Sequence, residues 1–104
     1  MELKRVVITG LGTVNPLGNN VEEYFKNLND GVSGAGPITR FDASLFKTKF
    51  ACEVKDFDPV KCGIDRKEAR KLDRFCQFAV VAADQAIEDS KMDLEKIDKD
   101  RVGV

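Results

Sequence analysis

The sequence predicts an α/β protein, in which strands and helices pack against each other. Three observations lead to this class: a strand-like run at residues 5–9, an amphipathic helix that begins near residue 21, and an apolar helical stripe across residues 66–89. A continuous β-branched run is typical of a strand that is covered on both faces. Because two or three short strands cannot cover so long a helix, we expect a mixed sheet whose remaining strands lie beyond residue 104.

Length and charge limit the classes of function. The chain has 104 residues, with 17 basic and 18 acidic side chains and a net charge of −1. This balance argues against a protein that binds nucleic acid through its overall charge. The longest apolar runs are too short to span a bilayer, and the first residues lack the features of a secretory signal. We therefore expect a cytoplasmic protein that does not associate with membranes.

The first third of the chain contains the strand at residues 5–9 and then a helix. Gly10 and Gly12 follow the strand, which must end near Pro16 because proline cannot donate to a sheet. Asn20 is a favourable N-cap, and Glu23 completes an approximate capping box before the apolar positions of the helix. Gly31 is placed to end this helix, about ten residues later.

The remaining elements are a loop, a short strand, a long helix and the start of another strand. Glycine, proline and serine punctuate residues 31–42, which predicts a loop, and residues 50–54 resemble a short strand. Asp65 and Glu68 form a capping pattern ahead of a helix expected over residues 66–89. Residues 101–104 resemble the beginning of a strand. The apolar stripe of the long helix consists of Ala69, Leu72, Cys76, Ala79, Val80, Ala83 and Ile87.

The glycines after the first strand suggest a nucleotide-binding loop only weakly. Such a loop reads G-x-G-x-x-G and opens directly into a helix. Here Asn15 stands at the sixth position, and the next helix begins only near Val21. Glycines that let two backbones pack closely are the better interpretation of Gly10 and Gly12.

The cysteines offer no clear nucleophile or metal ligand. Cys52, Cys62 and Cys76 are widely spaced, and the chain has no histidine that could activate a thiol or bind a metal ion. Cys76 lies on the apolar stripe, which indicates a packing role. We therefore assign no catalytic residue, cofactor or metal site to these 104 residues.

Basic side chains crowd the predicted start of the long helix. They are Arg66, Lys67, Arg70, Lys71 and Arg74, and the last four share one face of a continuous helix. Cations near a helix N-terminus oppose the helix dipole, at a cost of about 0.3–1 kcal/mol each when exposed. This arrangement suggests either a surface for an acidic partner or a solvated charged face, and spacing alone does not separate the two.

The whole chain resembles the N-terminus of β-ketoacyl–acyl carrier protein synthases, and most closely the type II bacterial branch. The two most distinctive segments read RVVITGLGTVNPLGN at residues 5–19 and DRKEARKLDRF at residues 65–75. Shorter matching segments lie at residues 31–34, 40–42, 50–51, 54–57 and 83–87.

The resemblance implies a thiolase-like layered fold, with residues 1–104 as the N-terminal portion of its first domain. It implies a cytoplasmic homodimer that condenses an acyl chain with malonyl-acyl carrier protein, using a nucleophilic cysteine and two histidines. None of the three cysteines matches that nucleophile, so these residues alone are expected to be inactive. The resemblance also implies that Lys67, Arg70 and Lys71, with Arg66 and Arg74 beside them, help to bind acyl carrier protein.

Several alternatives share this N-terminal pattern. They are a type I synthase, a polyketide ketosynthase and a non-catalytic paralogue that sets chain length. A nucleotide-binding α/β protein is a more distant alternative. The preferred acyl-chain length does not follow from these residues.

Overall fold

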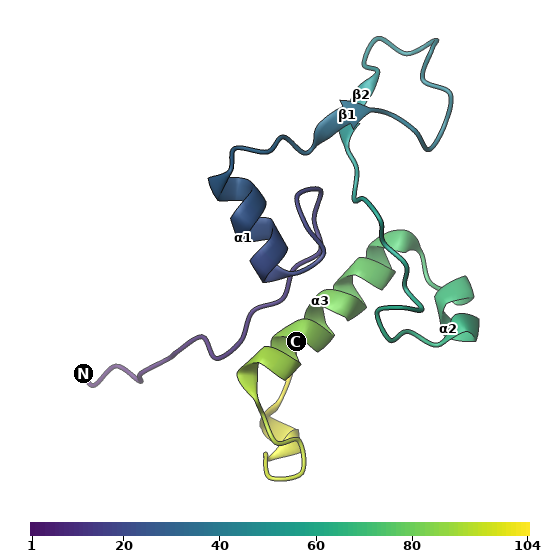
Figure 1. Ribbon diagram of the computed structural model, residues 1–104. Coiled ribbons are helices and arrows are strands. Elements are labelled where there is room, and N and C mark those ends of the chain that lie inside the picture. The colour runs from purple at the N-terminus through teal and green to yellow at the C-terminus, as the bar shows by residue number, and fades with distance from the viewer.

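The computed structural model describes residues 1–104, and its helices and strands form an open arrangement in which the elements project away from one another (Figure 1). The radius of gyration is 17.6 Å, whereas a compact domain of this length has one of about 13 Å. Only six of the 104 residues are buried. The elements in chain order are α1 (Val21–Asn29), β1 (Ala35–Pro37), β2 (Phe50–Cys52), α2 (Arg66–Lys71), α3 (Arg74–Ser90) and a 3₁₀ turn (Lys99–Arg101).

Helix α1 confirms the capping pattern read from the sequence. The Asn20 side chain accepts a hydrogen bond from the Glu23 backbone amide at 2.8 Å. The Glu23 carboxylate in turn accepts from the backbone amide of Asn19, one residue before the N-cap. Gly31 has a φ of 69°, the left-handed conformation that glycine adopts most easily after a helix. Local sequence therefore determines both ends of α1.

The only sheet is an antiparallel pair formed by β1 and β2. Gly36 lies opposite Ala51, and the pairing continues past Pro37 through a bond from the Ile38 amide to the Lys49 carbonyl. Strand β2 confirms most of the strand expected at residues 50–54. The prediction of an uninterrupted loop over residues 31–42 is wrong, because β1 lies within it. The three residues of β1, Ala35–Pro37, show no strand pattern in the sequence, and they form a strand only because β2 pairs with them.

Two predicted strands are absent. Residues 5–9 have no regular structure, and residues 101–104 follow the 3₁₀ turn without pairing. Val6 is 89% exposed and Ile8 is 83% exposed, so these side chains are uncovered. A strand is defined by its partner, and neither run pairs with another segment of residues 1–104. The structure thus shows an α/β composition without a layered sheet.

The glycine-rich segment after residue 9 lies directly against α3. A side chain at Gly10 would clash with the backbone of Ala86, and one at Gly12 would clash with the backbone of Ala82. The Thr13 amide donates to the Gln85 side chain at 3.1 Å, on the same face of α3. These contacts confirm that the glycines allow close backbone packing.

The single helix predicted over residues 66–89 is instead two helices with a break at Leu72 and Asp73. Both residues have extended ψ values, 136° at Leu72 and 156° at Asp73. The Gln77 side chain donates to the Ala69 carbonyl at 2.8 Å and to the Leu72 carbonyl at 3.4 Å. A tertiary hydrogen bond thus replaces helical ones at the break. No proline or glycine lies at this position, so the apolar helical periodicity of the sequence continues across the break without a sign of it.

A small apolar cluster joins the two helices to the segment before them. It contains Phe57, Ile64, Ala69 and Val81, and Phe78 packs edge-on against Phe57 with ring centroids 4.9 Å apart. Val81 is the most buried residue of α3, whereas most of the predicted stripe on α3 is exposed. Helix α3 therefore has apolar residues on two faces, and only one face is covered. None of the helices combines the length and the apolar character needed to cross a membrane.

Candidate functional site

Helix α2 carries most of the basic residues predicted to form a site. The Asp65 side chain caps its N-terminus by accepting from the amides of Lys67 and Glu68, at 3.0 and 3.4 Å. Ala69 is the only buried residue of the helix and belongs to the apolar cluster. The four basic side chains of α2 are all exposed, and we call them the basic surface: Arg66, Lys67, Arg70 and Lys71.

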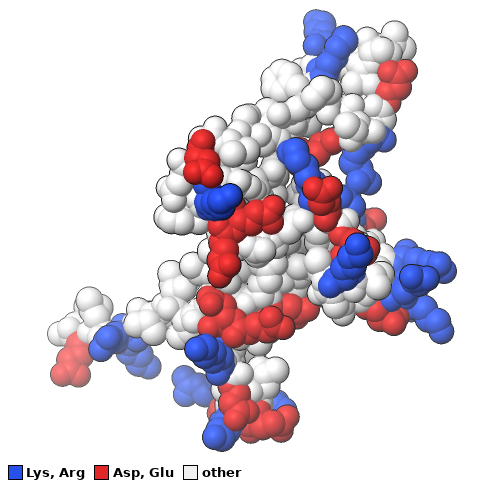
Figure 2. Space-filling model, in the orientation of Figure 1, with Lys and Arg blue, Asp and Glu red and all other residues white.

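The basic surface has a net charge of +3, because α2 contains four basic residues and one acidic residue. Figure 2 shows lysine and arginine side chains gathered at the edge of the molecule where Figure 1 places α2. Lys71 pairs with Glu68 at 3.3 Å, and both side chains are well exposed. Arg66, Lys67 and Arg70 form no salt bridge. Their charges are therefore available to an external group.

Arg74 is separated from the basic surface by the helix break. It begins α3 and is half-buried, with its guanidinium over the rings of Phe57 and Phe78 at 5.5 and 5.2 Å from their centroids. Such cation–π contacts stabilise the packing of the two rings, and they leave the guanidinium charge of Arg74 near the surface. The shared face predicted for Lys67, Arg70, Lys71 and Arg74 is therefore wrong for Arg74, since it required one continuous helix.

The helix break also changes which basic residues lie near a helix N-terminus. Arg70 and Lys71 lie in the last turn of α2, where the dipole favours cations. Only Arg74 begins a helix that has no acidic residue in its first turn. The unfavourable placement inferred from the sequence therefore does not hold for Arg70 or Lys71. What distinguishes the basic surface is its exposure and its uncompensated charge.

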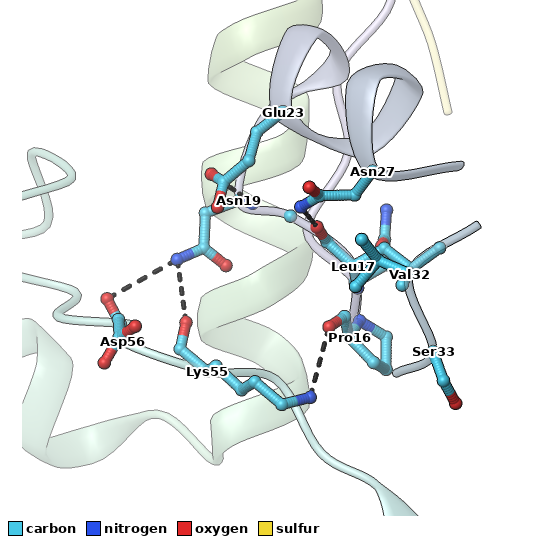
Figure 3. Close-up of a pocket in the computed structure, with 11 residues that line it drawn as sticks. Pro16, Leu17, Asn19, Glu23, Asn27, Val32, Ser33, Lys55 and Asp56 are labelled. Carbon is cyan, nitrogen blue, oxygen red and sulfur yellow. Dashed lines mark hydrogen bonds between the residues drawn. The ribbon is translucent and has the colours of Figure 1, made fainter. Parts of the chain in front are cut away.

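A second polar region surrounds the turn between residues 15 and 19 (Figure 3). The Lys55 ammonium donates to the carbonyls of Pro16, Gly34 and Glu53, at 3.3, 3.1 and 3.2 Å. The Asn19 amide donates to the carbonyls of Lys55 and Asp56 (Figure 3). No pattern in the sequence indicates this arrangement, because it joins segments about 20 to 40 residues apart.

This polar region connects backbone segments and offers little to a ligand. A lysine ammonium has three N–H groups, and Lys55 uses all three on carbonyl oxygens. The cavity beside it has a volume of about 140 Å³. Asn19 Oδ1 is the one buried side-chain oxygen that lacks a hydrogen-bond partner. Because the Lys55 ammonium and the Asn19 amide nitrogen are both used on backbone carbonyls, we regard the region as a structural link between the turn before α1 and the segment after β2.

All three cysteines are free thiols, and the chain has no histidine that could activate one of them. Cys52 and Cys62 are exposed, and Cys76 is half-buried on α3. The half-burial of Cys76 agrees with a packing role. The described residues contain no group of three or more histidine, cysteine, aspartate or glutamate side chains arranged to hold a metal ion.

Comparisons with known proteins agree over nearly the whole chain. Residues 3–104 match the family model described as "Beta-ketoacyl synthase, N-terminal domain". The chain is 51% identical over 104 residues to 3-oxoacyl-(acyl-carrier-protein) synthase 2 of Synechocystis sp. (strain ATCC 27184 / PCC 6803 / Kazusa). It is 54% identical over 104 residues to the protein of the same name in Coxiella burnetii (strain RSA 493 / Nine Mile phase I). Both matches cover 100% of this chain and 25% of the relative, so the chain spans about a quarter of their length.

Solved structures also resemble this one. The ishigamide ketosynthase/chain length factor has a TM-score of 0.74 and 39% identity, over 88% of this chain and 22% of that one. A ketosynthase solved in complex with a type II polyketide acyl-carrier protein has a TM-score of 0.64 and 26% identity, over 88% of this chain and 23% of that one.

Proposed function

Because the chain belongs to the β-ketoacyl synthase N-terminal domain family, we propose that residues 1–104 form the N-terminal portion of a type II β-ketoacyl–acyl carrier protein synthase. Such an enzyme elongates fatty acids by a decarboxylative condensation of an acyl chain with malonyl-acyl carrier protein. The observation that carries this proposal is the 51–54% identity, across the full chain, to two relatives named 3-oxoacyl-(acyl-carrier-protein) synthase 2.

The chemistry of this class requires groups that the chain does not contain. A cysteine takes the acyl group from its thioester, two histidines assist decarboxylation of malonyl, and backbone amides stabilise the thioester oxygen. The chain has no histidine, and none of its three cysteines matches the position of the family's nucleophile. We therefore assign catalysis to the rest of a longer protein and expect residues 1–104 to be inactive alone.

The uncovered surfaces fit a segment that packs inside a larger layered fold. Residues 5–9 carry β-branched side chains that are mostly exposed, and α3 has a second, uncovered apolar face. Large apolar surfaces of this kind are normally covered in stable proteins. We infer that the run at residues 5–9 joins a mixed sheet and that α3 packs on that sheet, as in a thiolase-like fold.

For the basic surface, we propose that it binds acyl carrier protein, with Arg74 contributing from its edge. Three of its four cations form no salt bridge, and its net charge of +3 suits an acidic helix of the partner. The similar ketosynthase that was solved with its acyl-carrier protein supports this type of partner. Charges at the edge of such an interface mainly accelerate association and set orientation.

The family resemblance further leads us to propose a homodimer in the cytoplasm. Among the alternatives, a polyketide ketosynthase, a type I synthase and a chain-length paralogue all share this N-terminal segment. Sequencing of the region that follows residue 104 separates them, because the paralogue lacks the nucleophilic cysteine and the others differ in their acyl pockets.

The docking proposal is tested by reversing the charge of the basic surface in the complete enzyme. Lys67→Glu, Arg70→Glu and Lys71→Glu together change α2 from a net charge of +3 to −3. We expect a large loss of activity with acyl and malonyl groups on carrier protein, and unchanged activity with small thioester analogues. The matched control reverses three exposed lysines elsewhere: Lys4, Lys47 and Lys99. Equal losses with both kinds of substrate would show that the basic surface is structural.

A further inference from the structure

The break between α2 and α3 determines where the basic surface lies. Helix α2 has only six residues, and isolated helices of that length are unstable in water. It buries one residue, Ala69, against the apolar cluster. Its orientation therefore depends on the groups that hold its two ends. At the N-terminal end this group is the Asp65 side chain, as described above.

At the C-terminal end, the group that holds α2 is the side chain of Gln77. The last carbonyls of a helix lack partners within the helix, and here the chain turns away at Leu72. The Gln77 amide comes from the first turn of α3 and donates to the carbonyls of Ala69 and Leu72, at 2.8 and 3.4 Å. One side chain thus connects the two helices across the break.

The side of α3 that carries Gln77 is itself fixed. Arg74 lies over the rings of Phe57 and Phe78, and Leu72 packs against the apolar cluster. Gln77 is half-buried, and its two hydrogen bonds set the direction of its side-chain amide. The carbonyl that accepts its shorter hydrogen bond belongs to Ala69, which immediately precedes Arg70 in the basic surface.

We propose that Gln77 is a positioning residue for carrier-protein docking, which holds α2 so that Arg70 and Lys71 keep one orientation relative to the rest of the enzyme. This inference rests on the proposed docking function of the basic surface. Gln77 does not touch the partner. It raises the fraction of molecules in which the basic surface is ready to bind, and this lowers the apparent dissociation constant.

The chemistry of the side chain explains why glutamine is required. The two groups that it contacts are both acceptors, so the side chain must donate. Glutamate has nearly the same shape, but its carboxylate is only an acceptor when ionised. Gln77→Glu therefore removes the connection and places a negative charge beside two carbonyl oxygens. Gln77→Met removes the donor without adding charge.

A matched control is available two turns further along α3. The Gln85 amide donates to the Asn19 carbonyl at 2.6 Å, a contact that does not involve α2. Gln85→Glu makes the same chemical change on the same helix and removes one donor of a similar kind. Gln85→Glu therefore controls for the loss of an amide donor on α3, and Gln77→Met controls for the negative charge that Gln77→Glu adds near the basic surface.

The experiment uses the complete enzyme and two measurements. Hydrogen exchange is followed in the peptide that contains α2, and steady-state kinetics are compared for a carrier-protein substrate and a small thioester. For Gln77→Glu we expect faster hydrogen exchange in α2 and an unchanged kcat. The KM for the carrier-protein substrate should rise roughly three- to tenfold, which corresponds to about a third to a tenth of molecules holding α2 in place. Small-thioester kinetics should stay within about twofold of wild type, and Gln85→Glu should leave the carrier-protein KM unchanged.

The inference is overturned if α2 exchanges faster while the KM for carrier protein stays the same, if exchange in α2 does not change, or if both substrates lose activity equally. If the glutamate variant does not fold, Gln77→Met is subjected to the same measurements with the same expected outcome. Failure of the docking proposal itself gives a different result: the triple charge reversal of the basic surface would then leave the carrier-protein KM unchanged, whatever Gln77 does.

Discussion

Gly12 provides a sharp test of how the N-terminal segment packs on α3. In the substitution Gly12→Ala, the added methyl group would clash with the Ala82 carbonyl and lie 2.8 Å from both the Ala86 amide nitrogen and the Gln85 Cβ. Comfortable contacts between carbon atoms are about 3.5–4.0 Å, so the segment must withdraw by roughly 1 Å. The φ of Gly12 is not positive, so the cost arises from these contacts alone.

The size of the effect follows from the hydrogen bonds on each side of Gly12. A withdrawal of about 1 Å would break the bonds from Leu11 to Asp89 and from Thr13 to Gln85, which are 2.9 and 3.1 Å long. Their loss costs about 2–4 kcal/mol after allowance for the exposed carboxylate. Alanine restricts the unfolded chain and returns about 0.4–1 kcal/mol. We therefore expect Gly12→Ala to lower the free energy of unfolding by about 1–4 kcal/mol.

The assay is urea denaturation of the complete enzyme, with Gly36→Ala as the control. Gly36 lies in β1, has no atom within 4 Å of the position a Cβ would occupy, and has no positive φ. Its substitution should change the free energy of unfolding by less than about 1 kcal/mol in either direction. If the two alanine variants are equally stable, residues 10–13 are not seated on α3 and the reasoning is refuted.

Three further predictions concern other contacts. Lys55→Met should lower the free energy of unfolding by about 1–3 kcal/mol, because three carbonyls lose a charged donor, and urea denaturation that shows no change would contradict this. Hydrogen bonds from Thr39, first from its hydroxyl and then from its amide, lower the pKa of Glu53. The ionised carboxylate therefore stabilises the β1–β2 hairpin above about pH 4.3 and ceases to do so as the pH falls through the lowered pKa. Thr39→Ala should raise this pKa toward its ordinary value in an NMR titration, and an unchanged titration would remove this explanation. Arg70→Gln should weaken carrier-protein binding about two- to fivefold, and Lys71→Gln should weaken it less, because Lys71 already has an ion-pair partner. Calorimetry that finds the larger loss of affinity in Lys71→Gln would contradict this electrostatic explanation.

The features that the sequence predicted correctly depend on neighbouring residues. Asn20 and Asp65 cap α1 and α2 through hydrogen bonds that span two or three residues, and Gly31 ends α1 through its own backbone conformation. The close packing of Gly10 and Gly12 was also predictable, because a partial glycine motif without a helix after it has few other uses. The two caps and the end of α1 are decided within about one turn of chain, whereas the glycine packing joins residues 10–13 to α3.

The features that were missed depend on contacts between separate elements. The break at Leu72 and Asp73 is stabilised by Gln77 and by the stacking of Arg74 on two phenylalanine rings, which no helical periodicity reveals. Residues 5–9 have strand composition, but a strand also requires a partner. For the candidate site, the sequence identified the charges, whereas only the structure separates Arg74 from the four residues of the basic surface.

A charge exchange between the two partners tests the central claim most directly. The dissociation constant for acyl carrier protein would be measured for the wild-type enzyme and for the Lys67→Glu, Arg70→Glu and Lys71→Glu variant, each with normal carrier protein and with a carrier protein whose acidic docking residues are changed to lysine. We predict weak binding for each altered partner with its normal counterpart, and substantial recovery when both are altered. Tight binding of normal carrier protein to the reversed enzyme, or no recovery with the altered pair, would contradict the account.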